Sequence, residues 1–170
     1  MTGVLVVGIA DCAVTSNPSE TLITYALGSC IAITIYDPLM RVAGLVHYLL
    51  PDATFESGRG EKNPFLCADT AIPLLLHRAR QAGADKRRLV VHLIGGAQVI
   101  DDNGVFQIGQ RNCLAARRIL SKAGVLIQGE ETGGSVSRSV RMEVDTGRVW
   151  VREGTGAGKE MLSCNEKSEF

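Results

Sequence analysis

The sequence predicts an α/β sandwich in which helices cover one face of a sheet and a second sheet covers the other face. Short segments rich in β-branched residues outnumber helical segments, at about eight strands against about two helices. Tight turns join many of these strands, which makes the sheets largely antiparallel. So few helices cannot cover both faces of such a sheet, and we therefore expect the helices on one side only.

The composition is that of a globular protein with no electrostatic preference for nucleic acid or anionic membranes. The chain has 170 residues, of which 45% are hydrophobic and 21% charged, and its 18 basic residues balance its 18 acidic ones. The longest apolar runs are far shorter than the roughly 20 residues that span a bilayer, and the first residues carry no cationic signal. We expect a cytoplasmic protein with one domain over residues 1–153 and a polar tail over 154–170.

The first third of the chain supplies the central strands. Strands are expected over 4–10 and 21–26, followed by a hairpin of two strands over 28–36 and 42–50. The hairpin turn contains Asp37 and Pro38, because Asp bonds its own backbone and Pro fixes φ. A polar loop over 52–64 follows the hairpin directly, and it either covers a site there or lies free in solvent.

Two helices are expected further along the chain. Either Asp69 or Thr70 caps the first, and Pro73 favours Thr70, because a missing N–H then breaks no helical bond. The second helix begins at Asn112 as its N-cap and ends at Gly124. The remaining strands are expected over 89–94, 125–128, 137–144 and 147–152.

The cysteines are expected to be free thiols. Their number is five, which is odd, and the sequence has neither a C-x-x-C pair nor a Cys/His cluster with zinc spacing. Most cysteines in such a protein are small buried side chains, so only sequence context distinguishes a reactive one. Neither a metal ion nor an organic cofactor is indicated.

Cys30 and His47 stand out because the hairpin brings them together. If Tyr36 pairs with Arg41, Cys30 lies directly opposite His47 on the same face, with Cβ atoms about 4.5–5.5 Å apart. A thiol and an imidazole at that distance are a candidate nucleophile and base, whereas a slip of one residue would separate them. The alternative is a buried cysteine beside a structural histidine.

The neighbouring residues indicate supporting roles. Gly28 allows a tight turn, and backbone N–H groups around Ser29 and Cys30 are candidate donors to an oxyanion. Thr24 lies on the preceding strand, and its hydroxyl is a candidate partner that orients His47. The hairpin strands offer no Asp or Glu for this role.

The other polar motifs are interpreted as structural. His77 lies among apolar positions of the first predicted helix, and His92 lies in an apolar strand without an evident thiol partner. The segment Gly95-Gly96-Ala97 follows a strand but lacks the G-x-G-x-x-G spacing, so it is interpreted as a tight backbone corner rather than a nucleotide site.

Several separated segments form a further pattern along the chain. They are Thr24-Tyr-Ala-Leu-Gly28-Ser29-Cys30, Tyr36-Asp37-Pro38, Gly44-Leu-Val-His47-Tyr-Leu-Leu-Pro51, Asp69-Thr70-Ala71-Ile72-Pro73, Gly95-Gly96-Ala97, Ile108-Gly109-Gln-Arg111-Asn112 and Gly133-Gly134 with Arg138. In this order they resemble the chemoreceptor glutamine deamidase family, CheD, over roughly residues 3–152.

The resemblance implies a chemotaxis enzyme that hydrolyses glutamine side chains of chemoreceptors to glutamate and releases ammonia. It implies a three-layer α-β-β sandwich with largely antiparallel or mixed sheets and two main helices on one face. Family members use a cysteine, a histidine and a threonine, which correspond here to Cys30, His47 and Thr24. The expected partners are methyl-accepting chemoreceptors and the phosphatase CheC, with neither nucleic acid nor insertion into a membrane.

Two other interpretations remain open. In the first, the protein is a regulatory binding partner of CheC with little or no turnover. In the second it is a thiol redox sensor, which needs a second cysteine close to Cys30 and is not supported by any C-x-x-C pair.

Overall fold

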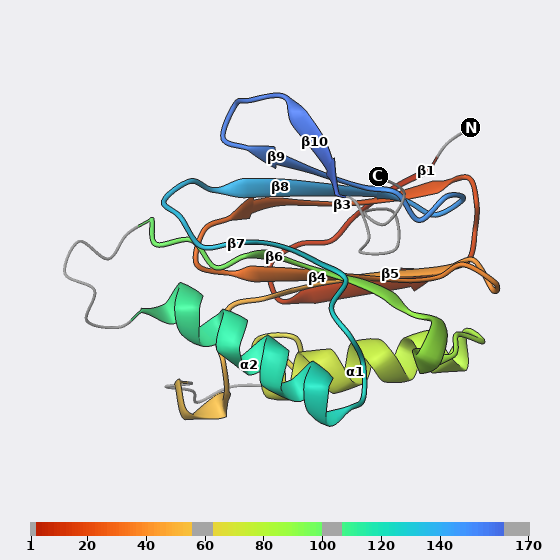
Figure 1. Cartoon of the computed structure of the whole chain (residues 1–170), viewed down its shortest axis with the longest axis horizontal. Coiled ribbons are helices and arrows are strands. Elements are labelled where there is room, and N and C mark those ends of the chain that lie inside the picture. The colour runs from red at the N-terminus through yellow and green to blue at the C-terminus, as the bar shows by residue number, and fades with distance from the viewer. Residues whose placement is uncertain (1–2, 56–62, 100–106, 162–170) are drawn as a thin grey trace, which may run out of the picture.

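The computed structural model describes residues 3–55, 63–99 and 107–161, which form three layers (Figure 1). The helices α1 (Ala68–Gln81) and α2 (Ile108–Lys122) cover one five-stranded sheet, and a second five-stranded sheet packs on its other face. The predicted α-β-β sandwich with mixed, largely antiparallel sheets and two main helices on one face is confirmed.

The sheet next to the helices has a centre that is buried on both faces. In spatial order its strands are β2 (Asp11–Thr15), β5 (Val42–Tyr48), β4 (Ile31–Asp37), β6 (Val90–Gly95) and β7 (Gly129–Thr132). All neighbours pair antiparallel except β6 and β7, which are parallel. Every residue of β4 and β5 is buried, because helices cover one face and the second sheet covers the other.

The second sheet contains a strand that the sequence did not predict. In spatial order its strands are β1 (Gly3–Val6), β3 (Glu20–Leu27), β8 (Arg138–Glu143), β9 (Val149–Glu153) and β10 (Gly158–Met161). Within the stretch predicted as a polar tail over 154–170, β10 pairs with β9 and buries Met161 between the sheets. Residues 162–170 lie outside the described residues.

Two strands lie elsewhere than predicted. The strand expected over 4–10 ends at Val6 as β1, and Ala10 has a φ of 53°, which an extended strand does not adopt. The next strand, β2, begins at Asp11 and belongs to the other sheet. The strand expected over 125–128 is a connection to β7. Within it, the Gln128 side chain accepts a hydrogen bond from Val91 N at 2.6 Å and so holds the connection beside β6.

Both helices begin earlier than predicted. The N-cap of α1 is Cys67 rather than Thr70, whose hydroxyl instead donates to the Pro64 carbonyl at 2.6 Å. Asn112 lies inside α2 instead of capping it, because its side chain is engaged in contacts with other segments. Neither helix in the described part of the chain is long and apolar enough to cross a bilayer. Of the polar loop predicted over 52–64, residues 56–62 lie outside the described ranges, so its relation to a site stays a prediction.

The alternation of side chains along β4 divides the apolar residues into two cores. Ile31, Ile33 and Ile35 face the helices and join a core with the apolar faces of α1 and α2. Ala32 and Tyr36 face the second sheet and join the core between the sheets. A side chain on β4 or β5 therefore lies either under the helices or between the sheets.

The register of the β4–β5 hairpin differs from the prediction. Tyr36 pairs with Ala43 instead of Arg41, and His47 pairs with Ala32 instead of Cys30. The cause is the turn: Asp37 pairs with Val42 as part of the ladder, so the loop covers 38–41 instead of the 37–40 that a Tyr36–Arg41 pair requires. A shift of two positions preserves the face, so Cys30 and His47 remain on the side of the second sheet as diagonal neighbours.

Asp37 holds this turn in place. Its carboxylate is fully buried and accepts hydrogen bonds from the N–H groups of Leu39 and Met40 at 3.0 and 3.2 Å. It also accepts bonds from Asp85 N at 2.8 Å and from the Arg88 guanidinium at 2.7 Å. Burial alone raises the pKa of this carboxyl, but Arg88 and the backbone donors outweigh burial and lower the pKa to about 2.

We expect Asp37→Asn to reduce the free energy of unfolding by about 2 kcal/mol at pH 7, because it removes a charge-assisted network. The pKa of this carboxyl falls from 3.8 to about 2 on folding, so its contribution is complete above pH 4 and is lost as the pH falls through 2. In urea unfolding, the free energies of unfolding of the wild type and of Asp37→Asn should become equal as the pH falls over that range. Asp145→Asn, which breaks only the exposed pair with Arg41, is the control, and a gap independent of pH would contradict the assignment.

Candidate active site

The layer between the sheets brings Thr24 and His47 into contact. Thr24 projects from β3 of the second sheet, and His47 projects from β5 of the first. Both side chains are fully buried, and Thr24 Oγ1 lies 2.8 Å from His47 Nδ1. The predicted partner of the imidazole is therefore in place, although the catalytic roles of both residues stay predictions.

A third residue fixes the direction of this hydrogen bond. The Thr24 hydroxyl donates to the backbone carbonyl of Val7 at 2.7 Å, between β1 and β2. Because a hydroxyl carries a single proton, Oγ1 is left to act as an acceptor toward the ring. Nδ1 of His47 therefore carries the ring proton, and Nε2 has a free lone pair.

The surroundings of His47 keep this ring neutral. Burial lowers its pKa to about 4, so the imidazole is uncharged at neutral pH. Nε2 is buried and has no hydrogen-bond partner among the described residues. A buried, unpartnered acceptor is unfavourable for folding, and such groups in native proteins call for an explanation such as a catalytic role.

Cys30 lies at the entrance to β4 and packs against the core between the sheets. Diagonal neighbours across an antiparallel pair are about 7–8 Å apart, which a histidine side chain spans in part. Cys30 is half-buried, whereas Cys12, Cys67 and Cys113 are buried. Burial raises the pKa of the Cys30 thiol, and its own backbone N–H lowers it to a smaller extent. The thiol is therefore protonated at neutral pH and needs a base.

The backbone before Cys30 is held by its carbonyl groups. The Gly28 carbonyl accepts a hydrogen bond from Ala97 N at 2.8 Å, and the Cys30 carbonyl accepts one from Gly96 N at 2.9 Å. Gly95 has a φ of 113°, and a Cβ there would lie 2.3 Å from the Cys30 carbonyl oxygen. The glycines after β6 thus allow close approach to the cysteine loop, in line with their interpretation as a backbone corner.

The N–H groups of this loop remain available. Among the described residues, no backbone hydrogen bond has Ser29 N or Cys30 N as its donor. Gly28, Ser29 and Cys30 are all half-buried, so a substrate can approach them. The predicted oxyanion donors are therefore accessible, and their role stays a prediction.

Two contributors to this site were not predicted from the sequence. Val7 was interpreted as an ordinary strand residue, and a backbone carbonyl gives no sequence signal. Asn112 was interpreted as a helix cap, although it is buried and its amide bonds the loop before Cys30. The signal for Asn112 was its position one turn before the apolar stripe of α2, where a buried amide requires partners.

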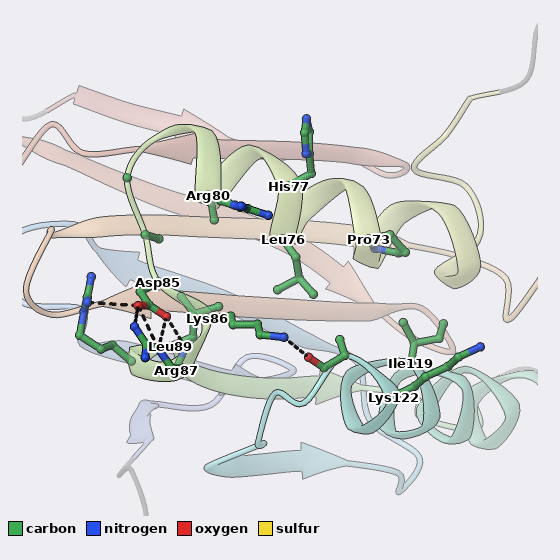
Figure 2. A pocket seen from close by; sticks show the side chains of 15 residues that line it. Pro73, Leu76, His77, Arg80, Asp85, Lys86, Arg87, Leu89, Ile119 and Lys122 are labelled. Atoms are coloured by element: carbon green, nitrogen blue, oxygen red, sulfur yellow. Dashed lines mark hydrogen bonds and ion pairs between the residues drawn. The ribbon is translucent and has the colours of Figure 1, made fainter.

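A hollow of about 980 Å³ lies apart from these residues, between α1, α2 and the short helix η2 (Lys86–Arg88). Figure 2 shows Arg87 beside Asp85. The Lys86 ammonium group donates to the carbonyl of Ala123 at 3.1 Å. None of the predicted site residues lines this hollow. In the described ranges, no three His, Cys, Asp or Glu side chains gather in a way that would hold a metal ion.

Comparison with known proteins matches this chain to one family over most of its length. The family described as CheD chemotactic sensory transduction matches residues 49–153. The probable chemoreceptor glutamine deamidase CheD of Solibacter usitatus (strain Ellin6076) is 49% identical over 158 residues, which cover 93% of each chain. The probable chemoreceptor glutamine deamidase CheD 1 of Syntrophus aciditrophicus (strain SB) is 44% identical and covers 94% of this chain and 99% of its own.

Among solved structures, the Bacillus licheniformis hypothetical protein YfiH is a distant likeness. It has a TM-score of 0.43 and 17% identity over 72% of this chain and 50% of its own.

The match to the Solibacter usitatus protein covers 158 of the 170 residues. The residues outside the match are too few for Thr24, Cys30 or His47 to lie beyond either end of it. All three residues precede the 49–153 segment that the family description matches.

Proposed function

This chain belongs to the CheD family of chemoreceptor glutamine deamidases, and from that premise we propose that Cys30, His47 and Thr24 perform its reaction. The substrate is a glutamine side chain of a chemoreceptor, and the products are glutamate and ammonia. Cys30 is the nucleophile, His47 is the general base and acid, and Thr24 orients His47.

One observation carries this assignment. The Thr24 hydroxyl donates its only proton to the Val7 carbonyl, so its oxygen accepts a hydrogen bond from Nδ1 of His47. Nε2 is therefore the basic nitrogen of the ring. This ring lies on the same face of the sheet as Cys30 and is neutral at physiological pH. A base in its correct tautomer beside a half-exposed thiol is what thiol activation needs.

The reaction begins with transfer of the Cys30 thiol proton to Nε2 of His47. No described residue bonds Nε2 in the resting protein, so we expect the thiol–imidazole hydrogen bond to form on substrate binding, as is common for catalytic contacts. The thiolate then attacks the carboxamide carbon of the glutamine. The N–H groups of Ser29 and Cys30, beside Gly28, donate to the developing oxyanion.

The second half of the reaction releases both products. The C–N bond breaks, and the imidazolium returns its proton to the departing nitrogen, which leaves as ammonia. A water molecule, deprotonated by Nε2, then attacks the thioester carbon, the C–S bond breaks, and the imidazolium returns the proton to the departing sulfur, which gives glutamate and the free thiol. His47 accepts and returns the proton in each of these transfers. The new carboxylate adds a negative charge to the receptor.

Mass spectrometry of a purified chemoreceptor incubated with the protein tests this function. We expect a gain of about one dalton at particular glutamines, because an amide is exchanged for an acid, together with an equal amount of ammonia. Receptor incubated alone is the control for spontaneous deamidation. Release of ammonia without the mass change, or no change in either, would contradict the proposal.

The phosphatase CheC remains a predicted partner on the basis of family resemblance alone. Binding without turnover would correspond to the regulatory interpretation. A pull-down with CheC, run beside the ammonia assay, separates the two, because a regulatory protein binds CheC and releases no ammonia from receptor. The deamidase is the favoured function, because the thiol, the imidazole and the hydroxyl are all present and Thr24 already contacts His47.

A further inference from the structure

Asn112 bridges the two segments that carry the reacting groups. It is fully buried on α2, and its side-chain nitrogen donates to the Ser29 carbonyl at 2.9 Å and to the Leu49 carbonyl at 2.7 Å. Because both partners are carbonyl oxygens, which only accept, the atom facing them is the NH₂ group of the amide. Both protons of that group are therefore used in this bridge.

The bridge begins where the strand ladder stops. The last pair between β4 and β5 is Ile31 with Tyr48, so neither Ser29 nor Leu49 is held by the hairpin itself. Ser29 directly precedes Cys30, and Leu49 follows His47 by two positions. The Asn112 amide therefore sets the distance between Ser29 and Leu49, where the hydrogen-bond ladder of the hairpin no longer holds the two strands together.

The same contact sets the direction of a backbone donor. The Ser29 carbonyl and the Cys30 N–H belong to one planar trans peptide, in which they point in opposite directions. Holding the carbonyl toward Asn112 turns the Cys30 N–H away from α2. Ala97 N acts on the Gly28 carbonyl in the same manner and so directs the Ser29 N–H.

We propose that Asn112 is a positioning residue for the deamidation, and that its amide presents the Cys30 N–H to the oxyanion and holds Cys30 at its working distance from His47. This inference rests on the proposed function. In this proposal Asn112 does not touch the substrate itself. It sets the positions of the Cys30 thiol and the Cys30 N–H, which do. This role also explains why a buried amide is kept in the otherwise apolar face of α2.

Kinetics of Asn112→Ala on receptor glutamine test the proposal. We expect kcat to fall about 10²-fold, because the donor and the nucleophile are misplaced. KM should change less than about threefold, because Asn112 is fully buried and its loss exposes no new surface to the receptor. Tyr48→Phe is the matched control. It removes the hydrogen bond from the Tyr48 hydroxyl to the Asn112 carbonyl, which also ties α2 to β5, but it leaves the side-chain bridge intact.

Equal losses of kcat in Asn112→Ala and Tyr48→Phe would overturn the proposal, because the amide would then act only by docking α2. An unchanged kcat in Asn112→Ala would overturn it as well. If Asn112→Ala does not fold, Asn112→Ser replaces it, since serine keeps one donor in a smaller side chain. We expect that variant to lose about 10-fold in kcat, and a loss no greater than that of Tyr48→Phe would equally refute the bridge.

A second measurement separates this inference from the proposed function. The rate of Cys30 alkylation by iodoacetamide is measured over a range of pH and followed on the Cys30 peptide by mass spectrometry. The midpoint of this pH dependence gives the thiol pKa without any turnover. The backbone N–H of Cys30 lowers that pKa, so misdirecting it in Asn112→Ala should move the midpoint of the alkylation rate against pH upward. An unmoved midpoint would count against the bridge even in a protein that fails to deamidate receptors.

Discussion

Replacing Cys30 by alanine is expected to reduce ammonia release from receptor by about 10⁴-fold or more, because the reaction would lose its proposed nucleophile. The thermal midpoint should change little, since this side chain is half-buried and lies at the end of a strand. Ammonia release and the gain of about one dalton on receptor glutamines are measured side by side for the variant and the wild type.

Cys12→Ala is the matched control for the nucleophile. Cys12 lies on β2 at the edge of the same sheet, and burial raises the pKa of its thiol to about 11, which makes it unreactive at neutral pH. We expect this variant to keep the wild-type rate. Turnover by Cys30→Ala at a comparable rate would show that the attacking group lies elsewhere.

Substituting His47 by glutamine is expected to lower kcat by about 10³-fold, because an amide neither accepts nor returns a proton. The wild-type pH profile gives a second signature. The pKa of His47 is lowered to about 4, so the basic form exists above that value and is lost as the pH falls through it. The acid limb of kcat/KM should therefore lie near pH 4 instead of the value of 6.5 for an exposed imidazole.

The chain offers a close internal control for this experiment. His92 on β6 lies 3.4 Å from the Thr34 hydroxyl, is buried, and has a pKa lowered by burial to about 4. Its environment thus repeats that of His47, except that no candidate nucleophile accompanies it. We expect His92→Gln to keep kcat within a few-fold on folded protein. Equal losses in both histidine variants would assign the effect to packing between the sheets.

The hairpin illustrates how far the sequence alone reaches. The composition of the strands and the Asp-Pro turn predicted the correct pair of strands, but the register was wrong by two positions. Asp37 belongs to the ladder because Arg88 and the Asp85 backbone, which are distant in sequence, hold its carboxylate. The prediction that Cys30 and His47 share a face was right, since faces alternate with a period of two.

Contacts made by the backbone could not be predicted. Thr24 was proposed as the partner of His47 from residue type, and the 2.8 Å contact is present. The tautomer, however, depends on the Val7 carbonyl, and every residue has a carbonyl. Asn112 was interpreted by a local rule for helix starts, whereas its partners Ser29 and Leu49 are far away in the sequence. β10 was missed because its polar, glycine-rich composition is untypical of strands, yet it pairs along the edge of the second sheet.

The Val7 carbonyl has a practical consequence for anyone who shortens this chain. A fragment cut to residues 49–153, the segment that the family description matches, would retain Asn112 and the glycine corner. It would lose the Cys30 thiol, the His47 ring and the Thr24 hydroxyl. It would also lose the Val7 carbonyl, which determines which ring nitrogen of His47 is unprotonated. A cut that removes residues 1–7 would leave the Thr24 hydroxyl proton without its acceptor. The hydroxyl would then be free to donate to Nδ1 of His47, which would move the ring proton to Nε2 and direct the lone pair at threonine.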